Sequence, residues 1–283
     1  NRTDCGMRSG KPFFVRAFTG LPRPRISVLG NEFAGVVESV GTNVTRFSIG
    51  DRVFGYSRRF GAHAELLCVP ESGMVARVPS GLSVTAVVAG TEGAHYALSC
   101  IRKAGITSGQ DVLVNGATGA IGSAAVQLLV DLGVRVTAVC GPAHVQLVRE
   151  LGAHRVIDRD AVDFTKDQHQ YDVVFDAVGK SSLRRCHALL KRRGLYVTTD
   201  LGWGYQNIVL PLLTRLGRGR RVMLPLPIEK REVVEYLRDR IADGRFRPVV
   251  DRTYPLDEIV DAYRYVESGQ KVGNVVITVV PTG

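Results

Sequence analysis

The chain has 283 residues, of which 45% are hydrophobic and 23% charged, so it can bury a sizeable core and hold two domains. Its formal net charge of +10 suits an anionic partner, but the basic residues are scattered in short clusters. No aromatic residues alternate with these clusters, so we interpret them as solvated helix faces and loop ends rather than a nucleic-acid site. The five cysteines are far apart, and neither a disulfide framework nor a thiolate metal lobe can be drawn from them.

Membrane insertion and secretion are not indicated. The longest apolar stretch, residues 112–130, is interrupted by Asn115, Gln127 and glycines, which suits a buried core better than a bilayer span. No signal peptide is visible, so we expect a cytoplasmic protein without membrane partners. The chain begins at Asn1 rather than at a methionine, which leaves room for an upstream targeting segment.

The first part of the chain has the pattern of a small, strongly curved β domain. Short runs rich in Val, Phe and Ala are separated by turn signals such as Gly41-Thr42-Asn43 and Ile49-Gly50-Asp51. The runs predict strands within 32–40, 52–55, 64–69 and 75–78. The pattern becomes helical over 85–101, so we place a domain junction near Thr85.

The segment 112–122, VLVNGATGAIG, predicts a buried strand, a glycine turn and the start of a helix. Gly116, Gly119 and Gly122 stand at three-residue spacing. Such glycines allow a tight turn, a close approach of backbone N–H groups to a pyrophosphate, and close packing of the helix on the strand. The first helical turn then receives the anion, because its unpaired N–H groups and its dipole favour negative charge. We therefore predict a dinucleotide site here.

Strands and helices alternate after the glycine turn, which predicts a parallel sheet covered on both faces. The expected strands lie at 134–139, 155–158, 172–178 and 195–199, and the expected helices at 144–151 and 182–191. The segment 221–225, RVMLP, predicts an edge strand of this sheet.

The C-terminal part predicts a helix over 229–241, a stop at Asp243-Gly244, and a second helix that opens within 254–258 and runs through Val266. A last strand over 274–280 must pair somewhere, and the first domain is its expected host. We therefore predict a chain that leaves the β domain, builds the nucleotide domain and returns. The expected divisions are 1–85, 86–246 and 247–283.

The chain resembles the medium-chain dehydrogenase/reductases, specifically the zinc-independent quinone oxidoreductase and zeta-crystallin-like branch. The resemblance covers the whole chain and rests on the order of five segments: LGNEFAGVVESVG at 29–41, VTRFSIGDRVFG at 44–55, GAHAEL at 61–66, VLVNGATGAIGSAAVQL at 112–128 and GNVVITV at 273–279. It implies an α/β fold in which a doubly wound Rossmann sheet accompanies a GroES-like β domain that the C-terminal segment completes. Family members carry further strands before the segment that opens this chain, so we expect a partial β domain.

Zinc-dependent members of the superfamily hold a catalytic zinc through a Cys, a His and a third ligand. The corresponding places here are Asn1, Asn31 and the neighbourhood of Thr91. Amides and a hydroxyl cannot replace thiolate and imidazole, because zinc prefers deprotonated sulfur and ring nitrogen. We therefore expect no metal and no Lewis-acid activation of an alcohol.

A reaction without a metal needs an acceptor that takes hydride readily. A quinone or an α,β-unsaturated carbonyl fits, because the charge on its oxygen is delocalised and can be met by amide or hydroxyl donors. We therefore expect NADPH-dependent hydride transfer to such an acceptor. The resemblance places Asn1 and Asp4 beside the nicotinamide and the substrate, with Asn31 and Tyr56 nearby. Alternatively, Asp4 caps a helix and Tyr56 is a loop aromatic, while Glu32 is expected to tie the β domain together.

The choice of cofactor depends on the end of the second strand of the nucleotide domain. An acidic residue there binds the ribose 2′-hydroxyl of NAD and repels a 2′-phosphate. Cys140 and Gly141 stand at that place, and His144 and Arg159 are near enough in the pattern to contact a phosphate, so we expect NADP(H). The alternatives are a surface role for Arg159 and a small buried role for Cys140.

The resemblance adds further cofactor positions outside the glycine loop. It places Thr91 near the nicotinamide ribose, and it places the residues after the fourth and fifth strands near the carboxamide. Asn274 stands where relatives often carry a lysine, and Trp203 either lines the acceptor cleft or packs. The complete expected set is Thr91, Gly116, Ala117, Thr118, Gly119, Ala120, Ile121, Gly122, Cys140, Gly141, His144, Arg159, Val178, Leu201, Gly202 and Asn274.

Two other functions stay open. One is a zinc-free enoyl reductase that acts on thioester-linked acyl chains, although such enzymes often use a tyrosine where this chain has Cys5-Gly6-Met7. The other is a non-catalytic nucleotide-sensing or RNA-binding protein on the same fold. Relatives pair through the edge strand at 221–225, so a homodimer is expected in addition to the small-molecule acceptor.

Overall fold

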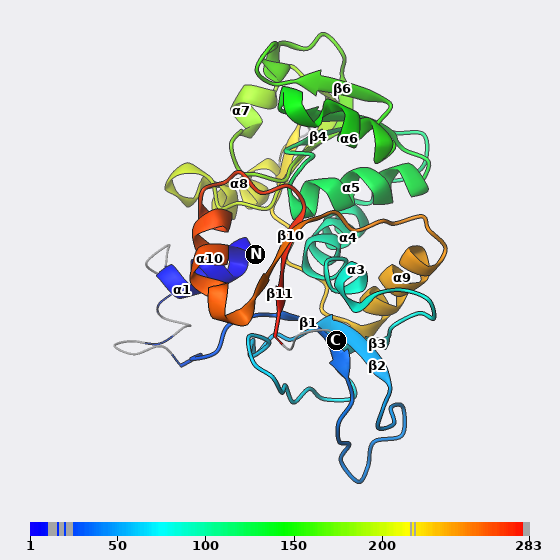
Figure 1. The fold of residues 1–283 in the computed structure, drawn as a ribbon. Coiled ribbons are helices and arrows are strands. Elements are labelled where there is room, and N and C mark those ends of the chain that lie inside the picture. The colour runs from blue at the N-terminus through cyan, green and yellow to red at the C-terminus, as the bar shows by residue number, and fades with distance from the viewer. Residues whose placement is uncertain (11–15, 17–19, 21–24, 216, 218, 280–283) are drawn as a thin grey trace. The chain divides into compact units, whose positions relative to one another are not determined.

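The computed structural model describes residues 1–10, 16, 20, 25–215, 217 and 219–279. The chain divides into two compact units: unit 1 is Asn1–Glu92 with Glu229–Gly283, and unit 2 is Gly93–Ile228. The colours of Figure 1 follow the chain through these units, from blue through green to red. The sequence analysis placed the junctions after residues 85 and 246. The second junction comes earlier in the structure because α9 (Arg231–Ala242) packs against β3 (Met74–Arg77) of unit 1.

Unit 1 contains an antiparallel sheet with the strand order β1 (Glu32–Val36), β2 (Arg52–Tyr56) and β3. Phe47, Val53 and Val75 form a small core at this sheet. The strand predicted over 64–69 is wrong, because this segment is irregular and leaves Leu66 exposed. The other helices in the described part of the unit are α1 (Arg2–Ser9), α3 (Val84–Val88), the short η4 (Leu256–Glu258) and α10 (Ile259–Glu267).

The C-terminal strand belongs to unit 1, as predicted, but its partner differs. β11 (Asn274–Thr278) pairs in parallel with β10 (Val250–Pro255) and not with the sheet of β1, β2 and β3. The Asn274 side chain anchors the start of β11, because its Nδ2 donates to the backbone oxygens of Ala89 and Val249, both at 3.0 Å.

In the described part of unit 2, six parallel strands form one sheet in the order β6-β5-β4-β7-β8-β9. Their bounds are β4 Asp111–Asn115, β5 Arg135–Cys140, β6 Arg155–Asp158, β7 Tyr171–Asp176, β8 Leu190–Thr198 and β9 Arg221–Met223. The order reverses between β4 and β7, and such a switch point is where open α/β sheets bind ligands at the carboxyl ends of their strands. The predicted doubly wound sheet and its edge strand β9 are confirmed.

Helices connect these strands: α4 (Glu92–Ala104), which begins at the last residue of unit 1, α5 (Ala120–Asp131), α6 (Val145–Glu150), α7 (Leu183–Cys186) and α8 (Gln206–Arg215). Short 3₁₀ turns occur at η1 (Pro142–His144), η2 (Phe164–Lys166) and η3 (Trp203–Tyr205). The helix predicted over 182–191 is too long, because Leu189 and Leu190 turn into the sheet core and β8 begins at Leu190.

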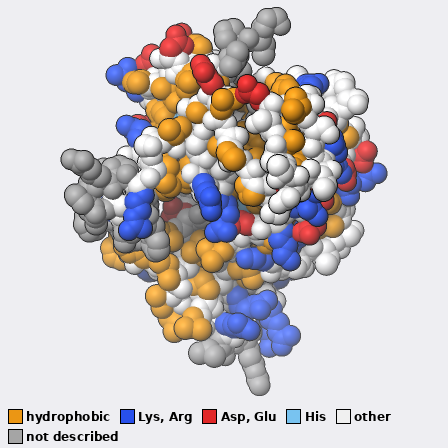
Figure 2. Space-filling view, turned by 90° about the horizontal axis from the view of Figure 1, so that it is seen from below, with side chains coloured by type: hydrophobic (Ala, Val, Ile, Leu, Met, Phe, Trp, Pro, Cys, Tyr) orange, Lys and Arg blue, Asp and Glu red, His pale blue; other side chains and the backbone are white. Residues whose placement is uncertain are grey.

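Two surface properties of the chain bear on its environment. Among the described residues, no helix combines the length and apolar character that crossing a bilayer requires. Figure 2 shows one face on which Lys and Arg side chains lie in several separate groups among hydrophobic ones.

The cysteines are all free, and only Cys68 is exposed while the other four are buried.

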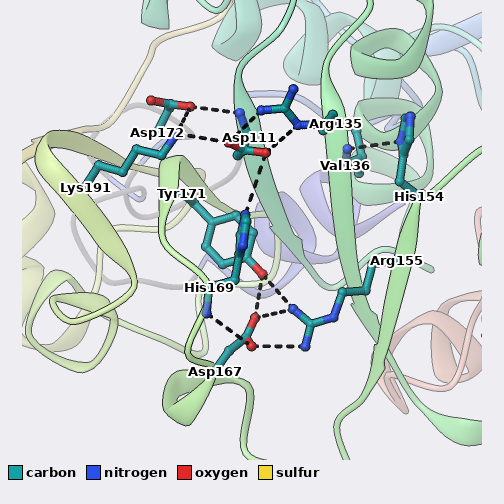
Figure 3. A network of polar contacts seen from close by, with 10 residues as sticks. All are labelled: Asp111, Arg135, Val136, His154, Arg155, Asp167, His169, Tyr171, Asp172 and Lys191. Atoms are coloured by element: carbon teal, nitrogen blue, oxygen red, sulfur yellow. Dashed lines mark hydrogen bonds and ion pairs between the residues drawn. The ribbon is translucent and has the colours of Figure 1, made fainter.

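A polar network ties together the first residues of neighbouring strands in unit 2 (Figure 3). Asp111, at the start of β4, accepts hydrogen bonds from Arg135 Nε at 2.7 Å and from Lys191 Nζ at 2.9 Å. Lys191 also donates to Asp172 at 2.8 Å. The hydrogen bond from Arg135, supported by Lys191, holds the pKa of the Asp111 carboxyl well below its ordinary value. Asp111 therefore contributes stability as a carboxylate.

We expect Asp111→Asn to lower the free energy of unfolding by about 1–3 kcal/mol at neutral pH, since charge-assisted hydrogen bonds are lost. The contribution of the wild-type carboxylate is present above the ordinary pKa of Asp and is lost as pH falls through the lowered folded-state pKa. Urea unfolding of both proteins at neutral and acidic pH should therefore show a difference that shrinks in acid.

The matched control is Asp261→Asn, which removes an ion pair to Arg264 whose two side chains are 62% and 75% exposed. Its effect should stay within about 0.5 kcal/mol. Equal losses in the two variants would contradict a specific contribution from the Asp111 network.

Candidate functional site

Two glycines are required by the fold, Gly116 in the loop between β4 and α5 and Gly122 in the first turn of α5. Gly116 has φ of 81°, and a Cβ on it would lie 2.3 Å from Cγ1 of Val178. A Cβ on Gly122 would lie 2.1 Å from the carbonyl oxygen of Gly116. The backbone nitrogens of Gly116 and Ala117 donate to Val139 O at 3.2 and 3.1 Å, which anchors the loop on β5. The loop is therefore held in one conformation.

Gly119 has a different environment. It is the N-cap of α5, with φ of −73° and ψ of 169°, and it provides no side-chain hydrogen bond to the helix. A Cβ there would meet only Gly116 O, at 3.7 Å, so the space over the loop is open. The first turn of α5 contains no acidic residue. An open helix N-terminus with free N–H groups fits the pyrophosphate of a dinucleotide. Thr118, Ala120 and Ile121 complete this loop.

The residues predicted to select the cofactor lie together in unit 2. Cys140 ends β5 and is buried, and its backbone oxygen accepts from Arg159 N at 2.9 Å. A Cβ on Gly141 would lie 3.5 Å from Nη2 of Arg159, so the guanidinium stands beside Gly141. The backbone nitrogen of His144 donates to Gly141 O at 3.1 Å. Arg159 pairs with Asp160 at 3.4 Å, and both line a hollow of about 320 Å³ together with Arg185 of α7.

The remaining predicted cofactor residues fall in two places. Val178 follows β7 and adjoins Gly116, while Leu201 and Gly202 follow β8, at the carboxyl ends of the strands. Trp203, in η3, is 91% exposed. Thr91 and Asn274 belong to unit 1 and are buried. Within the described residues, Oδ1 of Asn274 is buried without a hydrogen-bond partner.

Unit 1 holds a second group of residues, which we call the amide–carboxylate cluster. It consists of Asn1, Asn31, Glu32 and Thr91, which the sequence analysis named, together with Glu92. The Nδ2 of Asn1 donates to Asn31 Oδ1 at 3.1 Å and to Glu32 Oε2 at 2.9 Å. The Nδ2 of Asn31 donates to Glu92 Oε1 at 2.8 Å. Thr91 Oγ1 and the backbone nitrogen of Glu92 donate to Glu32 Oε1 at 2.5 and 2.6 Å. Asn31, Thr91 and Glu92 are at most 5% exposed.

Local structure explains how each member of the cluster is placed. Oδ1 of Asn1 caps α1 by accepting from the backbone nitrogens of Thr3 and Asp4. Glu32 opens β1, and its carboxylate covers the N-terminus of α4, where negative charge is favoured. Glu92 is the first residue of α4. Three segments that are far apart in sequence therefore meet at one point.

Asp4 and Tyr56 lie beside the cluster. Asp4 is 2% exposed, completes a capping box with Asn1, and accepts from Gly30 N at 3.0 Å through Oδ1. The structure thus shows the helix-cap role that the sequence analysis gave as the alternative. Tyr56 ends β2 directly opposite Glu32 in the strand register. Its role in the reaction stays a prediction, as do the roles of the other named residues.

The two carboxyl groups of the cluster differ in their surroundings. Glu32 accepts three hydrogen bonds, from Thr91, Glu92 and Asn1. Burial and the neighbouring Glu32 carboxylate raise the pKa of Glu92 to about 8. The sequence analysis missed Glu92, although an acid at the start of the apolar segment GTEGAHYAL is a visible signal.

The donor groups of the cluster do not fit a zinc ion. Amides and a hydroxyl stand at the expected ligand positions, and they already bond to one another and to the two carboxyl groups. In the part of the chain that the structure describes, no three His, Cys, Asp or Glu side chains are grouped as metal ligands.

Comparison with known proteins gives two family matches. Residues 1–80 match the alcohol dehydrogenase GroES-like domain, and residues 151–277 match the zinc-binding dehydrogenase family. A 2-methylene-furan-3-one reductase of Solanum lycopersicum is 30% identical, with 99% of this chain and 69% of the relative covered. An NADPH-dependent alkenal/one oxidoreductase of Arabidopsis thaliana is 27% identical over 99% of this chain and 70% of its own length.

Solved structures agree with this picture. The Escherichia coli quinone oxidoreductase complexed with NADPH has a TM-score of 0.80 and 25% identity, covering 98% of this chain and 88% of its own. The quinone oxidoreductase from Coxiella burnetii shares the fold, with a TM-score of 0.81 and 23% identity over 99% of this chain and 87% of its own.

We expect Gly119→Asp to separate folding from nucleotide binding. The new carboxylate is a favourable N-cap for α5 and meets no close neighbour, so the free energy of unfolding should stay within about 1 kcal/mol of wild type. It would repel a pyrophosphate at the same helix end, so calorimetry should show at least about ten-fold weaker NADPH binding.

Lys230→Asp is the control, because Lys230 is the N-cap of α9 in unit 1 and also lacks a side-chain cap. It should leave the dissociation constant unchanged. Unaltered NADPH binding by Gly119→Asp would show that the pyrophosphate does not lie at this loop.

Proposed function

Because the chain belongs to the medium-chain dehydrogenase/reductase superfamily, in its quinone oxidoreductase-like branch, we propose that it transfers hydride from NADPH to a quinone or an α,β-unsaturated carbonyl. The chain is an NAD(P)H-dependent oxidoreductase of the quinone- and enone-reductase type. The observation that carries the finer proposal is the open glycine loop in a chain whose zinc-ligand positions hold amides.

The choice of NADPH is supported by the end of β5. Cys140 and Gly141 carry no charge that would repel a 2′-phosphate, and the Arg159 guanidinium stands beside Gly141. His144 follows within the same turn. When bound, the cofactor supplies the hydride. The glycine loop holds its pyrophosphate, and Arg159 holds its 2′-phosphate.

A conjugated acceptor is supported by the chemistry of the amide–carboxylate cluster. Without a metal, the negative charge on the acceptor oxygen must be spread by conjugation and met by hydrogen-bond donors. Amide groups supply such donors, and Asn31 lies among them in a buried, preorganised position. The relatives from Solanum and Arabidopsis are named for unsaturated ketone and alkenal substrates, which supports the same class here.

We also propose a homodimer through the β9 edge of unit 2. α8 packs against β9, and its Ile208, Val209, Leu212 and Leu213 are between 55% and 68% exposed. An apolar helix face beside an open strand edge favours pairing with a second copy, because both would otherwise meet water.

Sedimentation velocity should give a particle of twice the 30.8 kDa chain mass at micromolar concentration. Leu212→Asp should shift it to one chain, because a charge in an apolar interface is costly to bury. Ile49→Asp is the matched control, since Ile49 is also 68% exposed but lies in unit 1. A single-chain wild type, or a Leu212→Asp dimer, would refute the proposal.

The enzymatic proposal is tested by NADPH oxidation with 9,10-phenanthrenequinone and with butenone as acceptors. Turnover with NADPH should exceed turnover with NADH. Arg159→Ala should raise the KM for NADPH about ten-fold and leave the KM for NADH unchanged, because only NADPH carries the 2′-phosphate.

Arg264→Ala, which removes another exposed arginine, should change neither constant. More efficient use of NADH by the wild type would overturn the choice of NADPH. Nucleotide binding without turnover of either acceptor would favour a nucleotide-sensing protein instead.

A further inference from the structure

The two amide side chains of the amide–carboxylate cluster, those of Asn1 and Asn31, differ in how many of their hydrogens form hydrogen bonds. Asn1 donates both Nδ2 hydrogens, to Asn31 and to Glu32, and its oxygen caps α1. Asn31 donates one hydrogen to Glu92, and among the described residues its second hydrogen has no partner. An amide carries two such hydrogens. Asn31 is therefore the amide of this cluster that can bind a further oxygen atom.

Glu92 determines which way the Asn31 amide faces. Its Oε1 accepts from Asn31 Nδ2 at 2.8 Å, while Asn1 donates to the opposite end of the same amide at 3.1 Å. These two contacts place the Asn31 nitrogen toward Glu92 and its oxygen toward Asn1. Asn31, Asn1 and Glu32 also line a cavity of about 80 Å³ within unit 1.

The charge on Glu92 then matters for any oxygen that binds to Asn31. Glu32 accepts hydrogen bonds from three donors, and Asp4 is a further buried acid in the same place. A second charged group on Glu92 would add repulsion in a buried environment, where charges interact strongly. A neutral Glu92 avoids this repulsion and still accepts the hydrogen bond from Asn31.

Several charged and polar groups act on Glu92. Burial is the largest influence and raises its pKa, followed by Glu32 from β1, with a smaller contribution from Asp4 of α1. The amino group of Asn1 and a hydrogen bond from Thr3 act in the opposite direction. Lys271, in the segment before β11, also interacts with both Glu32 and Glu92, and its Nζ donates to Gly273 O at 2.5 Å.

We propose that Glu92 is a positioning residue that works as a neutral carboxylic acid, holding the Asn31 amide so that its second hydrogen binds the acceptor oxygen. The inference rests on the proposed function and deepens it. The β-carbon of an enone gains the hydride from NADPH, the C=C electron pair moves to the bond between the α-carbon and the carbonyl carbon, and the C=O π pair moves onto oxygen. Water then protonates the α-carbon, the C=O bond re-forms, and hydroxide is released. The negative charge appears on the oxygen that Asn31 contacts, so ionised Glu92 opposes the step.

The first test is the pH dependence of kcat/KM with butenone. The wild-type value should fall above about pH 8, close to ten-fold per pH unit, because the active form is the protonated one. Glu92→Gln keeps a neutral acceptor for Asn31. It should retain activity within about ten-fold of wild type and lose the alkaline decline.

Two further variants complete the series. Glu92→Ala removes the acceptor and should lower kcat more than it raises KM, because the Asn31 contact strengthens as charge develops on the acceptor oxygen. Glu267→Gln is the control, since Glu267 pairs with the exposed Arg8 in the same unit. It should leave the profile unchanged.

An infrared titration tests protonation without substrate and without any variant. Wild-type protein should show a protonated carboxyl C=O stretch that disappears near pH 8, and Glu92→Gln should lack it. Absence of such a band in the wild type overturns the inference even if the variants fail to fold. If the wild type is active and the decline of kcat/KM at alkaline pH persists in Glu92→Gln, the inference is also overturned. A wild type that reduces no acceptor defeats the proposed function, and this inference with it.

Discussion

The approach of Gly122 to the carbonyl oxygen of Gly116 is the contact on which unit 2 depends. A Cβ on Gly122 would lie only 2.1 Å from that oxygen, so helix α5 can stand this close to β4 only because the residue has no side chain. The same contact directs the first turn of α5 at the space over the loop, which Gly119 leaves open. The packing of α5 on β4 and the candidate anion site therefore share one local constraint.

Unit 1 is organised by a different kind of interaction. Where zinc-dependent relatives would use a metal to join distant segments, this chain uses hydrogen bonds between amides and carboxyl groups. Glu32 accepts three of them and ties the start of β1 to the start of α4. A network of this kind is valuable only when nearly all of its members are paired, because each unpaired buried group is costly. The cluster thus connects distant segments of unit 1 and is also the candidate site for binding the acceptor.

Much of the fold and part of the site could be predicted from the sequence, and the division follows the range of the interactions. The glycine loop depends on neighbouring residues, and the alternation of strands and helices is a local pattern, so both were predictable. The strand expected over 64–69 and the long helix over 182–191 failed, because tertiary packing and not local preference decides these segments. The acid at Glu92 is visible in the sequence, but its hydrogen bond to Asn31 spans 61 residues, so its place in the cluster did not follow from the local pattern.

The buried cysteines bear on the proposed reaction, in which the acceptor is a conjugated electrophile. Thiolates add to quinones and enones. A reactive cysteine in an enzyme with such an acceptor would therefore be alkylated by that acceptor. Burial raises the pKa of Cys100 to about 12 and that of Cys186 to about 11, and it also raises the pKa of Cys5 and Cys140. At neutral pH the raised pKa keeps these four thiols protonated. Cys100, Cys140 and Cys186 are also shielded by burial, whereas Cys5 borders the cavity that Asn31 lines and Cys68 is exposed. Protonation, more than burial, therefore protects Cys5 from the acceptor.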